Sequence, residues 1–471
     1  MEWFWGGEVN GERPPCGPGY QQCYTLADMA LPDFHRPVRM EFVGVPGIEA
    51  LLPLLELEHH EFEAVLGQPV ELSRVSPAAD HVWQVVFDPA APAAQLRAEP
   101  DGYRLSSVIP AAEDFGQSLN LLHALAHSDQ HTLSFTELDS YHEVVSRVRT
   151  MVENVYPYFQ LRGLDWDEIC VRYEGIAELP AEQFWTQLQR WVAELGDAHT
   201  TVMPTGTAHH PPYIAEMTEQ GALLHQVPKL SAAHRAGVRA GWMISVEDSD
   251  HWMATTGASV QHHSLVAARR FMQMRTASRR FTAQSPAGEH VQWEETPERP
   301  QPSVTATESG MRISRFDTET PTLLAQQLRE RQDDPVTTID LRGNVGGKLV
   351  VADQCRRMLL HQCGEYGHLQ YSNGQGGLSP MYPLLLEPAP TEFTGDIQIL
   401  VDSMTYSAAE DFLQPLVGLD HVRIIGGPTG GGSGRPITVP LMDGYSLRVS
   451  TTITYTTAQD PVEYFGIGQM T

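Results

Sequence analysis

Residues 397–410 read Ile-Gln-Ile-Leu-Val-Asp-Ser-Met-Thr-Tyr-Ser-Ala-Ala-Glu, and this stretch decides the class of fold. Its first five residues are mostly apolar and branched, which is typical of a strand that is buried on both faces of a sheet. A polar turn follows at 402–406, and the small residues after Ser407 favour a helix. The stretch therefore predicts a buried strand that passes through a short turn into a helix opening at Ser407.

The same order of elements occurs once more upstream. Residues 337–341 read Thr-Thr-Ile-Asp-Leu, and the glycine-rich turn Arg-Gly-Asn-Val-Gly-Gly at 342–347 separates this strand from a helix through 351–360. Strand, turn and helix in alternation are typical of a mostly parallel sheet. We therefore expect a multidomain α/β protein in which residues 301–471 form a core with a mostly parallel sheet.

The rest of the chain divides into four segments, as expected for a length of 471 residues. Residues 1–35 lack periodicity and predict a tail, and residues 36–118 predict a domain with strands such as 81–87, without recognisable chemistry. Residues 119–204 predict a helical segment, with helices at 141–155 and from 181 to a cap at Gly196. Short strands, glycine turns and one helix follow in residues 205–300.

Charge and composition exclude several classes of partner. The formal net charge is -28, so a nucleic-acid partner is excluded, because phosphate binding needs a basic surface. No apolar run reaches the roughly 18 residues of a membrane-spanning helix, and the N-terminus lacks the basic and apolar regions of a signal peptide. We expect no membrane span, and the sequence favours the cytoplasm over a secreted or periplasmic location.

No residues have the spacing of a metal site or of a cofactor motif. The five cysteines are an odd number, and only Cys16 and Cys23 could pair or bind metal, in the N-terminal tail. His123 and His127 are four residues apart, but the glutamate of the zinc-protease pattern is missing. The histidine pairs at 59–60, 209–210 and 262–263 have no third ligand nearby in the sequence. We therefore predict no metal and no cofactor.

Ser407 stands at a favourable place for a nucleophile. The first N–H groups of a helix have no partner within it, so they can stabilise a developing negative charge. The glycine-rich turn lies at the same end of the predicted sheet, so N–H groups of Gly346 or Gly347 could complete an oxyanion hole with that of Ala408. A phosphate-binding loop does not fit the glycine spacing. A capping box of Ser407 and Glu410 is the structural alternative.

Together these segments resemble the C-terminal processing (tail-specific) serine peptidases and their tricorn-like branch. From Tyr141 to the C-terminus the motifs keep the family's order: Tyr156-Pro-Tyr-Phe, Leu195-Gly-Asp-Ala-His-Thr, Asp340-Leu-Arg-Gly-Asn-Val-Gly-Gly, Thr405-Tyr-Ser-Ala-Ala-Glu and Gly427-Pro-Thr-Gly-Gly-Gly. Residues 222–247 resemble a PDZ domain, although Trp242 replaces its usual aspartate, so residues 205–300 are expected to be PDZ-like. The resemblance implies a ClpP/crotonase-like core and a serine endopeptidase that cleaves peptides or unfolded protein tails through an acyl-enzyme on Ser407.

The resemblance also implies the general base. The processing-peptidase branch uses a lysine at the position of Gly432, and this sequence contains only Lys229 and Lys348. The tricorn-like branch uses a histidine before the PDZ-like module, and His199 occupies that position. We therefore expect His199 to be the base, with Lys348 as the alternative.

A histidine base needs a carboxylate that orients its ring. The resemblance assigns this role to Glu463, and Asp197 is the local alternative. Two departures from the family pattern affect this part of the site: Ala198 replaces a serine, and residues 468–471 do not continue the family's terminal motif.

A non-catalytic protein on the same fold is the alternative function. It would bind a hydrophobic ligand, as retinoid-binding proteins do, or use only its PDZ-like module as a pseudoenzyme. The presence of both Ser407 and His199 favours the enzyme. Its expected partner is a peptide or unfolded protein, and the sequence leaves a homo-oligomer open.

Overall fold

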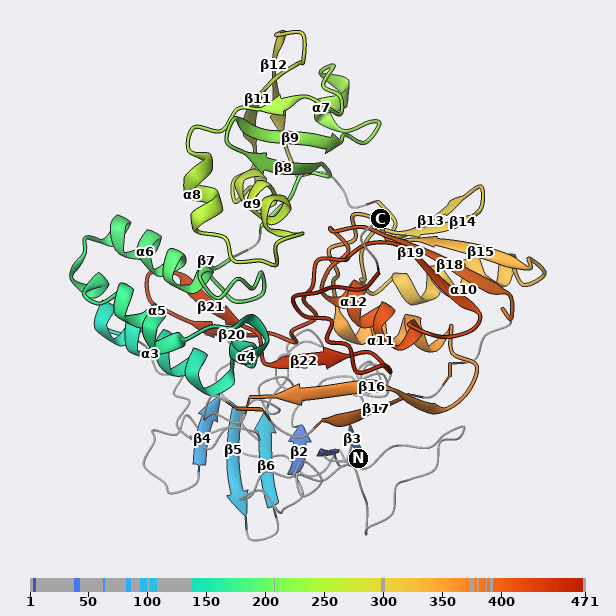
Figure 1. The fold of residues 1–471 in the computed structure, drawn as a ribbon, viewed down its shortest axis with the longest axis horizontal. Helices are drawn as coiled ribbons and strands as arrows, with labels where there is room; N and C mark the ends of the chain where they lie inside the picture. The colour runs from blue at the N-terminus through green and yellow to red at the C-terminus, as the bar shows by residue number, and fades with distance from the viewer. Residues whose placement is uncertain are drawn as a thin grey trace. The chain divides into compact units, whose positions relative to one another are not determined.

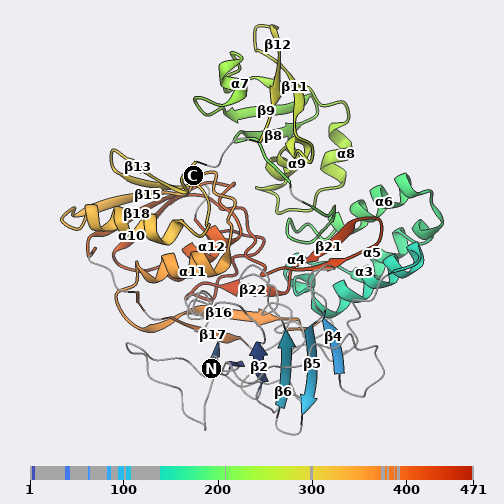
Figure 2. The same cartoon turned by 180° about the vertical axis from the view of Figure 1, so that it is seen from behind.

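The computed structural model describes residues 138–206, 208–297, 301–372, 377–378, 381–386, 388–389 and 393–468, and six strands between residues 3 and 107. The fold is mixed α/β with several sheets (Figures 1 and 2). The chain forms two compact units, of which the first is Met1–Trp166 with Ser303–Thr471 and the second is Asp167–Pro302. Among the residues described, no helix combines the length and the apolar character that crossing a membrane requires.

A five-stranded mixed sheet forms the core of the first unit. Its order is β13 (Val304–Thr307), β14 (Gly310–Ile313), β15 (Val336–Asp340), β18 (Asp396–Val401) and β19 (Val422–Gly426). Only β13 and β14 pair in antiparallel fashion, and the other three pairings are parallel. Helices α10 (Thr320–Glu330), α11 (Leu349–Arg357) and α12 (Ala408–Leu413) belong to the same unit. The predicted alternation of strand, turn and helix is confirmed.

The glycine-rich turn follows β15, and the turn that leads to Ser407 follows β18. β15 and β18 are parallel neighbours, with Asp340 opposite Leu400. Alternate residues of β18 are buried, and its apolar side chains pack into the core between the sheet and the helices. Because parallel neighbours end at the same edge, the glycine-rich turn after β15 and the turn before Ser407 emerge side by side.

A buried ion cluster fastens α11 to α12. The Asp353 carboxylate forms ion pairs with Arg356 and Arg357, all three being less than 10% exposed. Arg356 also donates through Nη1 to the backbone carbonyl of Asp411 at 2.9 Å, near the end of α12. Figures 1 and 2 show the two helices side by side below the sheet. The cluster therefore holds the helix that follows Ser407.

The described part of the first unit contains further helices and strand pairs. A helix, α3 (Tyr141–Val155), matches the predicted helix and buries its predicted apolar residues, and α4 (Phe159–Arg162) follows. β16 (Gly364–Tyr371) pairs with β17 (Tyr382–Leu386) and β22 (Thr452–Tyr455), and β20 (Ile437–Pro440) pairs with β21 (Tyr445–Val449).

Six strands are described between residues 3 and 107, in the order β3-β1-β2-β6-β5-β4. Their bounds are Trp3–Trp5 for β1, Val38–Phe42 for β2, Phe62–Glu63 for β3, Val82–Val85 for β4, Ala94–Glu99 for β5 and Gly102–Ser107 for β6. The strand predicted within 81–87 is β4, whereas β1 lies in the range that composition predicted as a tail.

The second unit combines helices with an antiparallel sheet. It contains α5 (Trp166–Arg172), η3 (Ile176–Glu178), α6 (Ala181–Ala193) and β7 (Thr201–Pro204). Its sheet has the order β12-β11-β10-β9-β8, formed by His290–Glu295, Arg279–Gln284, Met243–Ile244, Gly221–Gln226 and Ile214–Thr218. Helices α7 (Ala232–Arg235), α8 (Ser249–Ala254) and α9 (His263–Met272) complete it.

Two details of this unit bear on the sequence predictions. β9 is one of the short strands predicted for residues 205–300, and Gly237 has a left-handed backbone (φ 97°) that suits a glycine in one of the predicted turns. Helix α6 ends at Ala193 rather than at Gly196, because Gly196 (φ 65°) lies in the turn after the helix and donates to the carbonyl of Ala193. The loop that carries His199 therefore begins earlier than predicted.

We predict that Asp353→Ala lowers the free energy of unfolding by about 3–5 kcal/mol, because it leaves two buried guanidinium groups without their carboxylate. Urea unfolding measures this change. Glu153→Ala, which removes the exposed ion pair with Arg149, is the control and should cost less than about 1 kcal/mol. Equal losses in the two variants would show that the buried cluster does not fasten α11 to α12.

Candidate active site

Ser407 lies on the turn from β18 into α12 with an unusual backbone. Its φ and ψ angles are 60° and -128°, a conformation that residues with a side chain rarely adopt. Such strain persists only where the surrounding structure enforces it, and it is found mainly at functional sites. The carbonyl of Ser407 accepts from the N–H groups of Glu410 at 2.7 Å and Asp411 at 3.1 Å, so α12 begins directly after it.

The glycine-rich turn presses against this turn. A Cβ atom added to Gly346 would lie 2.8 Å from the Cβ atom of Ser407 and 2.8 Å from the nitrogen of Ala408, so only glycine fits. Hydrogen bonds hold the turns together: the Tyr406 N–H donates to the carbonyl of Asn344 at 2.9 Å, and the Thr405 hydroxyl group donates to that of Leu341 at 3.0 Å. The predicted closeness of the two turns is thus seen in the structure.

The three predicted oxyanion donors differ in their hydrogen bonds. The N–H of Gly346 donates to Oδ1 of the buried Asn344 side chain at 2.8 Å. Within the described part of the chain, no acceptor is found for the N–H of Ala408 or of Gly347. The structure therefore leaves Ala408 and Gly347 as the pair with available N–H groups.

Glu410 is completely buried and holds the loop that follows β19. Its Oε1 accepts from the Gly431 N–H at 2.8 Å and from the Thr429 hydroxyl group, and its Oε2 accepts from the Gly432 N–H at 2.8 Å. The capping contact to the Ser407 N–H is longer, at 3.3 Å. Burial raises the pKa of Glu410 to about 7, against the effect of these donors. The sequence predicts the capping contact between Glu410 and Ser407 but not the contacts of Glu410 with the loop at residues 429–432.

Glu463 is equally buried and holds the next part of the same loop. Its Oε1 accepts from the Ser433 hydroxyl group at 2.9 Å and the Gly434 N–H at 3.1 Å, and its Oε2 accepts from the Thr454 N–H at 2.8 Å. Burial raises the pKa of Glu463 to about 8.

The position that the resemblance assigned to a lysine is closed to any side chain. A Cβ atom added to Gly432 would lie 2.6 Å from Cε2 and 2.7 Å from Cζ of the buried Tyr406 ring. The carbonyl of Gly432 also accepts from the Ser407 N–H at 3.1 Å. The tyrosine ring therefore fills the space beside the nucleophile turn that a residue larger than glycine would need.

His199 belongs to the second unit, on the loop between α6 and β7, and its side chain is buried. Asp197 accepts from the backbone N–H of His199 at 3.0 Å through Oδ1 and from the Thr200 hydroxyl group at 2.6 Å through Oδ2. Both of these contacts shape the loop.

The residues that were considered as metal ligands lie in several parts of the chain. Among the residues described, no three His, Cys, Asp or Glu side chains are grouped so that they could hold a metal ion. The pairs Cys16 with Cys23 and His123 with His127, and the histidines at 59–60, lie outside the described residues. Lys348, the alternative base, is the residue before α11, and its N–H donates to the carbonyl of Phe316.

Comparisons with known proteins agree with this arrangement. Residues 310–468 match the model of peptidase family S41. The solved structure of mature CPAF complexed with lactacystin is similar, with a TM-score of 0.53 and 14% identity over 70% of this chain and 92% of that chain. Mature CPAF alone gives a TM-score of 0.52, also at 14% identity, over 70% and 91%. At this identity the likeness shows the fold alone.

A third solved structure, the photosystem II D1 C-terminal processing protease, matches with a TM-score of 0.49 and 18% identity over 70% of this chain and 92% of that chain. No curated protein matches the chain.

We predict that Gly432→Ala lowers kcat/KM at least about 10-fold, because the new methyl group displaces the Tyr406 ring and with it the residue before Ser407. In a Tyr406→Ala background the same change should cost much less, and peptide hydrolysis by the four proteins measures this coupling. Gly364→Ala is the control, since the nearest atom to its new methyl group is 3.4 Å away. Additive losses would refute the contact.

We also predict that the first unit becomes less stable as the pH rises from about 5 to about 8. Burial raises the pKa of Glu410 and Glu463 above the unfolded value, so the folded chain retains protons that the unfolded chain has released. Each such proton lowers the free energy of unfolding by up to about 1.4 kcal/mol per pH unit.

Urea unfolding across this pH range measures the slope. Glu463→Gln cannot titrate, so its free energy of unfolding should fall less steeply with pH than that of the parent protein. A variant with the parent's slope would mean that Glu463 is already ionised in the folded chain at about pH 5.

Proposed function

We propose that the chain is a serine peptidase with Ser407 as its nucleophile, because residues 310–468 match the model of peptidase family S41. The observation that carries this assignment is the strained backbone of Ser407, directly against the glycine-rich turn. A strained strand-to-helix turn presents the hydroxyl group of a serine nucleophile to the substrate in other hydrolases. Backbone strain of this kind is retained where the position of a hydroxyl group determines the rate of the reaction.

The proposed reaction is acyl transfer in two steps. His199 accepts the proton of Ser407 while Oγ attacks the scissile carbonyl carbon, which forms a tetrahedral oxyanion. His199 then protonates the leaving amine, and an acyl-enzyme remains on Ser407. Attack by water with His199 again as the base releases the second product and restores the serine.

We assign the oxyanion to the N–H groups of Ala408 and Gly347. Donors that are fixed before the reaction stabilise the oxyanion without a cost of reorganisation, and one such donor contributes about 100- to 1,000-fold in kcat. Gly346 is the weaker choice, because its N–H already donates to Asn344. Its role is to allow the close approach of the two turns.

Glu463 is proposed as the carboxylate that orients His199. Its contacts with Ser433, Gly434 and Thr454 hold the carboxylate in one orientation. Asp197, whose oxygens accept from the His199 N–H and the Thr200 hydroxyl group, is the local alternative. The choice of a histidine over a lysine also fits Gly432, which has no room for a side chain.

The proposed substrate is a peptide or an unfolded protein tail, and residues 205–300 are proposed as a PDZ-like module that captures it. β8 lies at the edge of the antiparallel sheet of this unit. An edge strand can accept an extended peptide as an additional strand, and main-chain hydrogen bonds of this kind do not depend on the peptide's sequence. Such capture suits an enzyme that acts on chain ends.

We predict that Ser407→Ala abolishes peptide hydrolysis and labelling by a fluorophosphonate probe, while the free energy of unfolding changes by about 1 kcal/mol. His199→Ala should lose about as much activity as Ser407→Ala, because the two residues act as one unit. Hydrolysis of a fluorogenic peptide and mass spectrometry of the labelled residue measure these effects.

Lys348→Ala is the matched control for the base and should retain the activity of the parent. If Lys348→Ala is inactive while His199→Ala is active, the base is the lysine. If Ser407 in the folded parent protein resists the probe and no peptide is cleaved, the chain is a binding protein on this fold.

A further inference from the structure

We propose that Asp402 is a positioning residue, which sets the distance between Ser407 and the glycine-rich turn. The inference rests on the proposed role of Ser407 as the nucleophile. Asp402 is the first residue after β18, where the chain leaves the sheet toward the nucleophile, and its side chain is partly buried.

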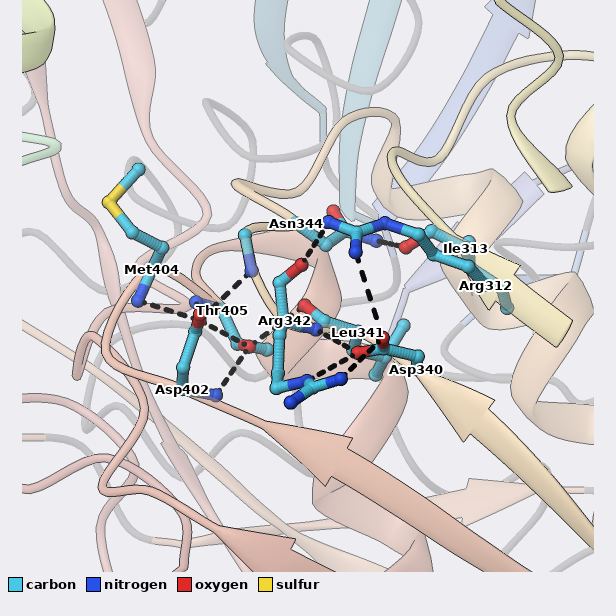
Figure 3. Close-up of polar contacts among 10 residues, drawn as sticks. Arg312, Ile313, Asp340, Leu341, Arg342, Asn344, Asp402, Met404 and Thr405 are labelled. Atoms are coloured by element: carbon cyan, nitrogen blue, oxygen red, sulfur yellow. Dashed lines mark hydrogen bonds and ion pairs between the residues drawn. The ribbon is translucent and has the colours of Figure 1, made fainter. Parts of the chain in front are cut away.

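One oxygen of Asp402 gathers donors from both turns. Its Oδ1 accepts from the N–H groups of Met404, Thr405 and Gly343, each at 3.0 Å. The first two contacts close the turn that leads to Ser407, and the third crosses to the turn after β15. Figure 3 shows the Asp402 carboxylate between the two segments.

The hydrogen bond from the Gly343 N–H to Asp402 is one of three that join the two turns. The Thr405 hydroxyl group donates to the carbonyl of Leu341, and the Tyr406 N–H donates to the carbonyl of Asn344. Thr405 also donates its hydroxyl group to Asp402 at 3.3 Å, and the Asp402 N–H donates to the Thr405 hydroxyl group at 3.1 Å. Asp402 therefore fixes both the segment before Ser407 and the hydroxyl group that makes the second link.

This spacing matters because the two turns are in close contact further along. Gly346, three residues after Gly343, lies against the Cβ atom of Ser407 and the nitrogen of Ala408. A shift of one turn relative to the other therefore moves the donors of the oxyanion hole relative to Oγ. A displacement of about 1 Å at a reacting group can cost about 100-fold in rate.

The contacts also predict what kind of side chain the position needs. All of the donors share one oxygen, and the neighbouring Arg342 forms its short ion pair with Asp340 rather than with Asp402. An amide oxygen at the same place accepts the same N–H groups. A longer carboxylate keeps the charge but moves the acceptor by more than 1 Å, about the length of one C–C bond. Position of the oxygen, rather than charge, should decide activity.

Three substitutions at this position test the inference. Asp402→Ala should lower kcat about 100-fold while KM changes less than about 3-fold, because substrate binding does not use the two turns. Asp402→Asn should retain kcat within about 10-fold of the parent protein. Asp402→Glu should lose about as much as the alanine variant. The rate of labelling by a fluorophosphonate should follow kcat, since its phosphoryl oxygen needs the same donors.

Controls separate positioning from general stability. Ser140→Ala removes a comparable side-chain acceptor, the Oγ atom that accepts from the Glu143 N–H at 3.3 Å at the start of α3, and should leave kcat unchanged. Circular dichroism and thermal unfolding identify any variant that fails to fold. If the alanine variant does not fold, the asparagine and glutamate variants still decide the question.

The possible outcomes are distinct. If Ser407→Ala is inactive and Asp402→Ala has the parent's kcat, the inference about Asp402 is wrong and the proposed nucleophile stands. If Asp402→Glu is active and Asp402→Asn is inactive, charge rather than position is required, which also overturns it. If Ser407→Ala itself retains activity, the proposed function fails before Asp402 is considered.

Discussion

The parallel pairing of β15 with β18 is the constraint on which the site depends. Asp340 lies opposite Leu400, so the chain leaves both strands at the same edge of the sheet. The turn after β15 and the turn after β18 therefore run side by side before α11 and α12 begin. Hydrogen bonds to Asn344 and Leu341 then fix the distance between the turns. A slip of the register would change the distance between Ser407 and the glycine-rich turn, because each of the two turns starts at the end of its strand.

Two buried glutamates hold the glycine-rich loop that follows β19, and their burial has an electrostatic cost. Glu410 and Glu463 together accept N–H groups from Gly431, Gly432 and Gly434, so they fix almost every residue of this glycine-rich loop. Burial of a charge without compensation is unfavourable, which explains why the pKa of both groups is raised despite these donors. The glycines of this loop have no side chains that could hold it, so their backbone N–H groups donate to the buried carboxylates instead.

Sequence reasoning found the parts of this site that follow from pattern and missed those that follow from packing. The apolar strands, the glycine-rich turn and the helix after Ser407 have strong local signals, and these elements are confirmed. The strain at Ser407 has no signature in composition. The contacts of Glu410 join residues about 20 positions apart, and nothing in a helical segment indicates that its glutamate reaches a distant loop. Asp402 offered a signal, since an aspartate after a strand often accepts backbone N–H groups two residues on.

The contact between Tyr406 and Gly432 links the choice of base to the position of the nucleophile. A side chain at 432 would collide with the tyrosine ring, and the tyrosine is adjacent to Ser407, so neither residue can change size independently. The loop that could have supplied a base instead supplies a carbonyl group to the Ser407 N–H. In the proposed mechanism the base must then come from a different part of the chain. The Asp167–Pro302 unit provides His199 on a loop whose own aspartate holds its backbone. The contact between the glycine at 432 and the aromatic ring of Tyr406 therefore leaves no room for a base at position 432.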